Sequence, residues 1–186
     1  GEVEHDDLTG DWVLEPCQHP LEFTTEQRFE PVDKGEETDT DVYRIAVFMS
    51  PLDVHVNRSP MAATIERMEH RTGKGMKRGP FRPAYKKESE YNERVRTVFV
   101  DETGLRIEVT QISGALARTI VPWQGIGDVM RRGQRYGMIR LGSRVDLRAP
   151  AALFEPGVTS AEMAQEKHPK GEFVQAGSSV LFNPRT

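Results

Sequence analysis

The chain has 186 residues, of which 37% are hydrophobic and 29% charged, a composition typical of a soluble globular protein with one adequate core. Its single cysteine, Cys17, excludes an internal disulfide and a cysteine-rich metal site, and its five histidines lack metal-ligand spacing, so we expect no bound metal. No apolar run approaches the ~20 residues of a transmembrane helix, and no signal peptide is visible.

The net charge of −4 is distributed unevenly along the chain. Residues 1–41 carry fourteen acidic and two basic side chains, a net charge of −12, whereas residues 42–186 carry +8. The densest basic run, residues 74–87, is rich in Gly and Pro, which predicts a loop suited to an anionic surface. Anionic lipid and nucleic acid are both candidate partners on charge alone, and a solvated loop without a partner is an equally good interpretation.

Apolar patterns along the chain predict mainly β-strands. The expected strands lie near residues 12–14, 43–49, 62–71, 95–100 and 105–112. The last of these alternates with a period of two after a hairpin turn at residues 101–104. Residues 113–120 fit either a helical turn or a strand, and a capping box at residues 159–162 predicts a short helix to about residue 168.

These elements predict a mainly β protein, a single antiparallel domain over residues 1–186 with few short helices. The pattern Gly-acid-apolar-x-x-x-Gly occurs at residues 127–133 and again at residues 171–177, each time followed by an expected strand. Lipoyl-type β modules often carry such hairpins with glycines at the turns, so we expect lipoyl-like hairpin elements.

Residues 136–147 are predicted to form a short apolar strand, a Gly142-Ser143 step and a second, alternating strand. A glycine here lets the backbone adopt strained angles, so the Ser143 hydroxyl can approach the Gly142 carbonyl. Attack of Oγ on this carbonyl gives an ester, β-elimination leaves dehydroalanine, and hydrolysis releases ammonia and leaves a pyruvoyl group. Most Gly-Ser pairs are turns, so an ordinary turn is the alternative interpretation of this step. Gly177-Ser178 is a second candidate cleavage site, which would leave only residues 178–186 as the small chain.

Five motifs occur in one order along the chain: Arg44–Met49, His55–Pro60, Asn92–Arg94, Gln111–Arg118 and Gly133–Asp146. In these motifs the sequence resembles the short-form phosphatidylserine decarboxylases, including the archaetidylserine decarboxylases of archaea. The resemblance covers residues 42–150, and residues 171–182 match the closing hairpin of the family.

The resemblance implies a pyruvoyl-dependent carboxy-lyase that cleaves itself between Gly142 and Ser143. The large chain would then be residues 1–142, with an acidic, divergent part at residues 1–41, and the small chain would be residues 143–186. The covalent pyruvoyl cofactor, derived from Ser143, would react with the amine of phosphatidylserine or archaetidylserine and accept the electrons released with carbon dioxide. The product would be a phosphatidylethanolamine-type lipid.

The resemblance also assigns roles to three polar residues that follow the first long strand. His55 matches the histidine of the family and is expected to transfer protons in decarboxylation or self-cleavage, although a structural loop histidine is the alternative. Asn57 and Arg58 are expected to hold the carboxylate or phosphate of the substrate. An ion pair with Asp53 that braces the loop is the alternative for this pair.

One motif departs from the family. Members usually carry Ser-Pro-Ala-Asp-Gly near the start, whereas this chain has Gln18 in place of the aspartate, and an amide cannot accept a proton at neutral pH. We expect His19 to substitute in self-cleavage, with Glu15 as a second candidate. The departure favours a rival function, a relative that binds anionic phospholipid without processing or catalysis. A pyruvoyl decarboxylase of a soluble amino acid is a third interpretation.

The resemblance finally implies where the protein works. We expect a peripheral protein on the cytoplasmic side of the cell membrane, whose partner is an anionic aminophospholipid and not nucleic acid. Self-association into a homo-oligomer is left open.

Overall fold

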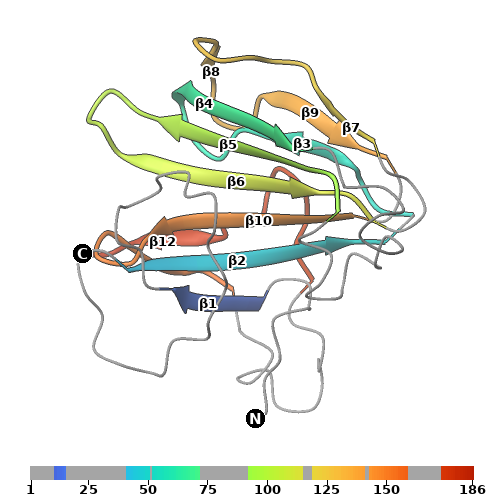
Figure 1. Cartoon of the computed structure of the whole chain (residues 1–186). Helices are drawn as coiled ribbons and strands as arrows, with labels where there is room; N and C mark the ends of the chain where they lie inside the picture. The colour runs from blue at the N-terminus through green and yellow to red at the C-terminus, as the bar shows by residue number, and fades with distance from the viewer. Residues whose placement is uncertain are drawn as a thin grey trace.

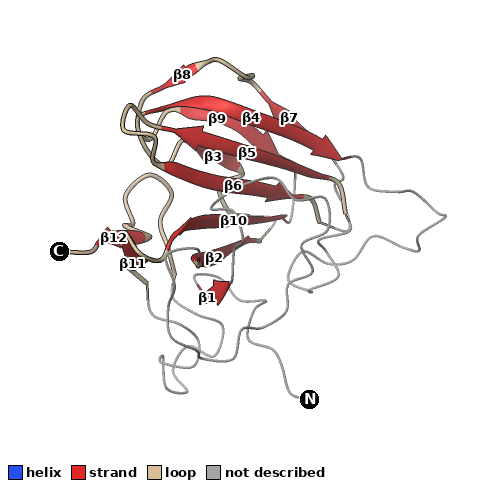
Figure 2. Ribbon diagram, turned by 60° about the vertical axis from the view of Figure 1, so that its left-hand side comes forward, coloured by secondary structure: helices blue, strands red, loops and turns tan. Residues whose placement is uncertain are grey.

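The computed structural model describes residues 11–15, 41–50, 52–71, 92–114, 119–140, 143–158 and 173–186, the first of these ranges by its backbone alone. These residues form β-strands and no helix (Figures 1 and 2). The strands pair antiparallel throughout, so the prediction of a mainly β, antiparallel protein is confirmed. The basic run 74–87 and the helix expected up to residue 168 lie outside the described residues.

A seven-stranded sheet forms the main layer (Figure 1). Its spatial order is β1 (Asp11–Glu15), β2 (Val42–Met49), β10 (Ser143–Pro150), β6 (Arg106–Ile112), β5 (Arg94–Val100), β4 (Ala63–Arg71) and β8 (Val129–Met130). The long strands of this sheet are those expected from alternation, and their bounds agree to within one or two residues. Since β10 pairs with both β2 and β6, the strand that begins at Ser143 lies inside the sheet and not at its edge.

A second, three-stranded sheet packs against the first. It has the order β3 (Val56–Arg58), β9 (Arg135–Ile139) and β7 (Ile120–Pro122). Both views place it near β4 and β5 and away from β1 and β2 (Figures 1 and 2). The core between the layers includes Ile65 and Phe99 from the large sheet and Tyr136 from the small one, and the rings of Phe99 and Tyr136 meet edge to face at 5.3 Å.

The C-terminal residues form a two-stranded pair, β11 (Phe154–Pro156) with β12 (Phe182–Pro184). This pair contacts β2, where Arg185 Nη2 donates a hydrogen bond to the Tyr43 hydroxyl at 3.2 Å. The sequence therefore ends beside the strand that precedes the His55 loop.

The repeated glycine pattern marks turns, as expected. Gly127 and Gly133 have positive φ angles of 91° and 76°, and Gly177 in the second copy has 81°. The first copy contains β8 and is followed by β9, and the second is followed by β12. The ambiguous segment 113–120 ends in a strand, because Ile120 opens β7, while residues 115–118 lie outside the described part of the chain.

Candidate functional site

Ser143 is the first residue of β10, and its side chain is 0% exposed. It pairs with Met49 at the end of β2. Its Oγ has no hydrogen-bond partner among the described residues. A buried hydroxyl without a partner costs stability, so it requires an explanation other than packing. Gly142 lies outside the described residues.

Ser178 has a different environment, although it also follows a glycine. It is exposed in the turn after Gly177, and its hydroxyl donates to the carbonyl of Gln175 at 3.4 Å. The backbone N–H of Ser178 donates to the same carbonyl at 3.2 Å. This is the geometry of an ordinary turn serine.

His55 is half-buried and lies directly before β3. Its Nδ1 lies 2.7 Å from the carbonyl oxygen of Asp53. Because a carbonyl only accepts hydrogen bonds, this contact requires the proton on Nδ1. In the neutral ring Nε2 is then the nitrogen that can take up a proton.

The topology brings His55 and Ser143 to the same end of the two layers. β2 ends at Met49, which pairs with Ser143, and the chain then passes through His55 into β3. β9, the partner of β3, ends at Ile139, whose N–H donates to the His55 carbonyl at 3.1 Å, and the chain then passes to Ser143. The connection from β2 to β3 carries His55, and the connection from β9 to β10 leads to Ser143. Because β2 pairs with β10 and β3 pairs with β9, these two connections lie next to each other.

Asn57 and Arg58 on β3 have separate roles in the structure. Asn57 is buried, and its Oδ1 accepts a hydrogen bond from Gln111 Nε2 on β6 at 2.7 Å. Arg58 is exposed, and its Nη1 donates to the Gly133 carbonyl at 2.8 Å. Asp53 accepts instead from the backbone N–H of Ser50 at 2.7 Å, so the ion pair between Arg58 and Asp53 that we considered is absent and that alternative is wrong.

A cavity of about 1280 Å³ adjoins these residues. Its wall is mainly apolar and includes Val47 and Met49 on β2 and Val145 and Leu147 on β10. Asn57 and Arg58 contribute polar groups to the same wall. Ser143 and His55 do not line the cavity, but chain neighbours of His55 and the strand partner of Ser143 do. The cavity therefore adjoins the segments that carry His55 and Ser143.

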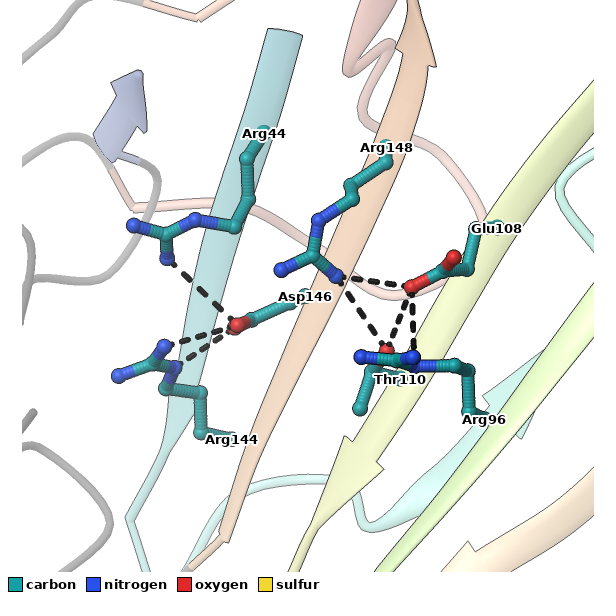
Figure 3. Close-up of polar contacts among 7 residues, drawn as sticks. All are labelled: Arg44, Arg96, Glu108, Thr110, Arg144, Asp146 and Arg148. Carbon is teal, nitrogen blue, oxygen red and sulfur yellow. Dashed lines mark hydrogen bonds and ion pairs between the residues drawn. The ribbon is translucent and has the colours of Figure 1, made fainter. Parts of the chain in front are cut away.

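The opposite face of β10 carries a buried network of charges (Figure 3). Successive residues of a strand point to opposite faces, so Arg144, Asp146 and Arg148 face away from the side of Ser143. Arg144 donates to both carboxylate oxygens of Asp146, at 2.6 and 2.8 Å, and Arg44 lies 3.5 Å from the same carboxylate. Arg148 donates to Glu108 on β6 at 2.9 Å.

This network and its burial shift the pKa values of two of its members. Burial alone would raise the pKa of Asp146, but the charges of Arg144 and Arg44 and the hydrogen bond from Arg144 outweigh it and lower the pKa to about 2. Burial also lowers the pKa of Arg96, which lies 3.4 Å from Glu108. The network joins β2, β10, β6 and β5 on the face of the sheet opposite to the Ser143 side chain.

The described part of the chain holds no group of three or more His, Cys, Asp or Glu side chains arranged for a metal ion. It also holds no helix with the length and apolar character that crossing a membrane requires.

Comparison of the sequence with known families gives one assignment. A family model described as phosphatidylserine decarboxylase matches residues 17–181. The chain belongs to the phosphatidylserine decarboxylase family. The resemblance seen in the sequence is thereby confirmed, and it extends beyond the residues 42–150 that suggested it.

Curated relatives agree with this assignment to the phosphatidylserine decarboxylase family. The chain is 46% identical over 129 residues to a phosphatidylserine decarboxylase proenzyme of Thermobifida fusca, covering 69% of this chain and 54% of that protein. It is 52% identical over 110 residues to the Streptomyces coelicolor proenzyme, covering 59% and 47%. It is 40% identical over 116 residues to a putative archaetidylserine decarboxylase proenzyme of Methanococcoides burtonii, covering 62% and 52%.

The chain thus spans about half the length of the curated relatives it matches. No solved structure matches it significantly. The structure places His55 beside the last residue of β9, whereas Arg58 binds the Gly133 carbonyl at the other end of β9, and Asn57 pairs with Gly137 between them. His19 lies outside the described residues, so its role stays a prediction. Sequence reasoning missed the charge network, although the Arg-x-Asp-x-Arg pattern within the expected strand 143–150 was a usable signal.

Proposed function

We propose that this chain is a self-processing, pyruvoyl-dependent decarboxylase of a serine phospholipid, either phosphatidylserine or archaetidylserine. The observation that carries the proposal is the buried Ser143 hydroxyl, which has no hydrogen-bond partner among the described residues and begins a central strand. Family membership and the word proenzyme in the names of the relatives support processing. The turn geometry at Ser178 favours Ser143 as the residue that reacts.

The self-cleavage that we propose uses the groups of the chain itself. The Ser143 Oγ attacks the Gly142 carbonyl, the C–N bond breaks as the ester forms, and the amine takes up the serine proton. Loss of the Ser143 α-proton then expels the Gly142 carboxylate and leaves dehydroalanine. Hydrolysis of dehydroalanine releases ammonia. Because Ser143 is held in a paired strand, its hydroxyl is pre-oriented toward one side of the backbone.

The residues around Ser143 fit a pyruvoyl group at this position. In a pyruvoyl group the Oγ of Ser143 is lost with the Gly142 carboxylate and Cβ becomes a methyl group, so the buried hydroxyl without a partner is removed. Ser143 also lies at the first position of its strand, where a new chain terminus disrupts little pairing. Such a group supplies an electrophilic carbonyl and an electron sink for decarboxylation.

His55 is the proton-transfer group in this proposal. The contact of its Nδ1 with the Asp53 carbonyl fixes the tautomer and directs the basic Nε2 away from the loop backbone. This arrangement suits delivery of a proton to the carbon that has lost carbon dioxide, or removal of a proton during self-cleavage. Gln18 stands where the family has an aspartate, so we propose that His19 assists self-cleavage.

Arg58 and Asn57 are proposed to orient the lipid headgroup. Arg58 lies in the cavity wall with donors suited to a phosphate or carboxylate, while Asn57 retains its NH₂ group as a donor after accepting from Gln111. The apolar wall favours a lipid over a free amino acid as substrate. The proposed location is accordingly the cytoplasmic surface of the cell membrane, as a peripheral protein, with self-association left open.

The test is to incubate the purified chain and identify its fragments by denaturing electrophoresis and mass spectrometry. We expect a small chain that begins at position 143 with a pyruvoyl group, which borohydride traps in the presence of phosphatidylserine. Ser143→Ala should abolish the fragment, and the matched control Ser178→Ala should not. An intact wild-type chain after long incubation would contradict the proposal.

One observation favours a second function. Gln18 cannot act as the base that the family aspartate provides, so a chain that stays uncleaved would be a lipid-binding relative without catalysis. Release of carbon dioxide from phosphatidylserine vesicles, compared with release from free serine, separates these functions. Release from serine alone would instead favour the decarboxylase of a soluble amino acid.

A further inference from the structure

We propose that the 1280 Å³ cavity receives the acyl chains of an anionic glycerophospholipid and that Leu52 and Phe173 at its mouth insert into the lipid surface. The proposal further assigns Arg132, beside Arg58, as a second contact for the lipid phosphate. The proposal rests on the proposed function for which headgroup the lipid carries. That the ligand is an anionic lipid with acyl chains follows from the apolar wall and the two arginines of the cavity.

The cavity exists because the second layer covers only part of the large sheet. The three-stranded sheet packs near β4 and β5, away from β2 (Figure 2). The core-facing side chains of the other strands, including Val47 and Leu147, are therefore only partly buried and line the cavity. Phe173 and Phe182 from the C-terminal segment also line it. The space is larger than the roughly 300–1,000 Å³ of sites for drug-sized ligands.

The mouth of the cavity is apolar and exposed. Leu52 is 97% exposed and Phe173 is 80% exposed, yet both line the cavity, so they must lie where it opens. Val54 and Val180 are also exposed and line it. Half of the large exposed hydrophobic side chains in the described part of the chain thus gather at one opening. Exposed apolar residues on an ordinary protein surface are scattered singly, whereas a contiguous cluster marks a contact with a membrane or a ligand.

Two cations lie in the wall of the same cavity. The Arg58 side chain lies against Gly177, where a Cβ atom would be 3.4 Å from Arg58 Nε, and Arg132 precedes the Gly133 carbonyl that Arg58 binds. Arg132 is exposed and forms no ion pair among the described residues. The position of these cations beside an apolar space matches an anionic amphiphile.

Two carboxylates also line the cavity, and both are engaged locally. Asp53 accepts a hydrogen bond from the backbone N–H of Ser50 at 2.7 Å. Asp101 accepts from the backbone N–H groups of Thr103 at 2.8 Å and Leu105 at 3.0 Å, and from the Thr103 hydroxyl at 2.7 Å. Neither forms an ion pair with the two arginines in the described part of the chain, so the arginines remain available to a phosphate.

Short-chain phosphatidylglycerols test the cavity independently of catalysis, because they are anionic but carry no amine to react. Calorimetry with the dibutyryl, dihexanoyl and dioctanoyl lipids below their micellar concentrations should show affinity rising by up to about fourfold per buried methylene. Ser143→Ala protein should show the same dependence. Affinity that is independent of chain length would overturn the proposal, whether or not the protein releases carbon dioxide.

Vesicles of phosphatidylglycerol and phosphatidylcholine test the mouth. Leu52→Ser and Phe173→Ser should each weaken binding about tenfold, since each removes an inserted side chain. The matched controls Ile126→Ser and Val129→Ser, exposed apolar residues outside the cavity, should bind as the wild type does. Arg132→Gln should reduce the preference for phosphatidylglycerol over phosphatidylcholine. Equal losses in the mouth and control variants would overturn the proposal.

The two sets of results separate this inference from the proposed function. Chain-length dependence without carbon dioxide release from phosphatidylserine would contradict only the proposed decarboxylase. Carbon dioxide release without chain-length dependence or mouth effects would contradict only the acyl-chain site.

Discussion

Gln111 on β6 and Asn57 on β3 join the two sheets through a side-chain hydrogen bond of 2.7 Å. Both side chains are buried, and Asn57 immediately precedes Arg58 in the cavity wall. The register places Gln111 opposite Val145, two residues along β10 from Ser143. The bond therefore fixes the loop that carries His55 relative to the strand that Ser143 begins.

Breaking this bond from one side should destabilise the fold. Gln111→Leu or Asn57→Leu leaves a buried amide without its partner, so each should lower the free energy of unfolding by about 1–3 kcal/mol. The double variant should lose less than the sum of the two, because no amide is left unpaired. Urea unfolding of the four proteins measures the coupling. Strictly additive losses would show that the bond contributes nothing.

The buried carboxylate of Asp146 should make the fold sensitive to acid. Its pKa is lowered from 3.8 to about 2, so its contribution is fully present above pH 4 and is lost as the pH falls toward 2. This contribution is about 2 kcal/mol. Urea unfolding between pH 7 and pH 2 should show the loss in the wild type and a flatter profile in Asp146→Asn.

The same substitution should also weaken the fold at neutral pH. Asp146→Asn leaves Arg144 and Arg44 without their carboxylate and should cost about 3–5 kcal/mol. Glu66→Gln is the matched control, because Glu66 pairs with Arg106 near the surface and should cost no more than about 1 kcal/mol. Equal costs at the two positions would contradict the stabilising role of the buried network.

His55 and His70 provide a matched test of proton transfer. His55→Gln should slow self-cleavage or carbon dioxide release by roughly 10²- to 10⁴-fold, the usual contribution of a general acid or base. His70→Gln should leave both rates unchanged, since His70 lies on β4, three strands away from the strand that Ser143 begins, and its Nε2 lies 2.8 Å from the Glu93 carboxylate. Fragment analysis reports cleavage, and carbon dioxide release reports turnover. A similar effect of both substitutions would remove His55 from the mechanism.

Much of the fold was predictable because it is encoded locally. Alternation over residues 105–112 and the apolar run 43–49 each specify a strand whatever their partners are, and the structure contains both. The pairing of β10 between β2 and β6 was not predictable, because it depends on contacts between segments far apart in the chain. Short strands such as β8, with two residues, carry too little pattern to be recognised.

The candidate site shows the same division. Ser143 and His55 were identified from motifs, since the residue types alone indicate the chemistry of a Gly-Ser step and of an imidazole. The cavity was not, because Val47 and Phe173 come together only through the final packing of the C-terminal segment on β2. The bond from Gln111 to Asn57 was missed for the same reason, as neither residue signals its partner.

Gly177 offers a test of how Arg58 is positioned. Gly177→Leu forces an L-residue to adopt a φ of +81°, and because its Cβ atom already lies 3.4 Å from Arg58 Nε, the rest of the side chain must share the space of Arg58. The backbone strain should cost roughly 1–2 kcal/mol of stability. Displacement of the guanidinium should raise the KM for phosphatidylserine roughly tenfold, because a charge-assisted hydrogen bond is worth about 1.5 kcal/mol.

Gly104→Leu separates the strain from the displacement of Arg58. Gly104 has a φ of +87°, close to that of Gly177, but a Cβ atom there meets nothing within 4 Å. The two variants should therefore lose similar stability in thermal unfolding, whereas only Gly177→Leu should raise the KM. If Gly104→Leu raises the KM equally, the effect comes from backbone strain and not from Arg58. If neither variant changes it, Arg58 does not bind the headgroup in the position that the structure gives it.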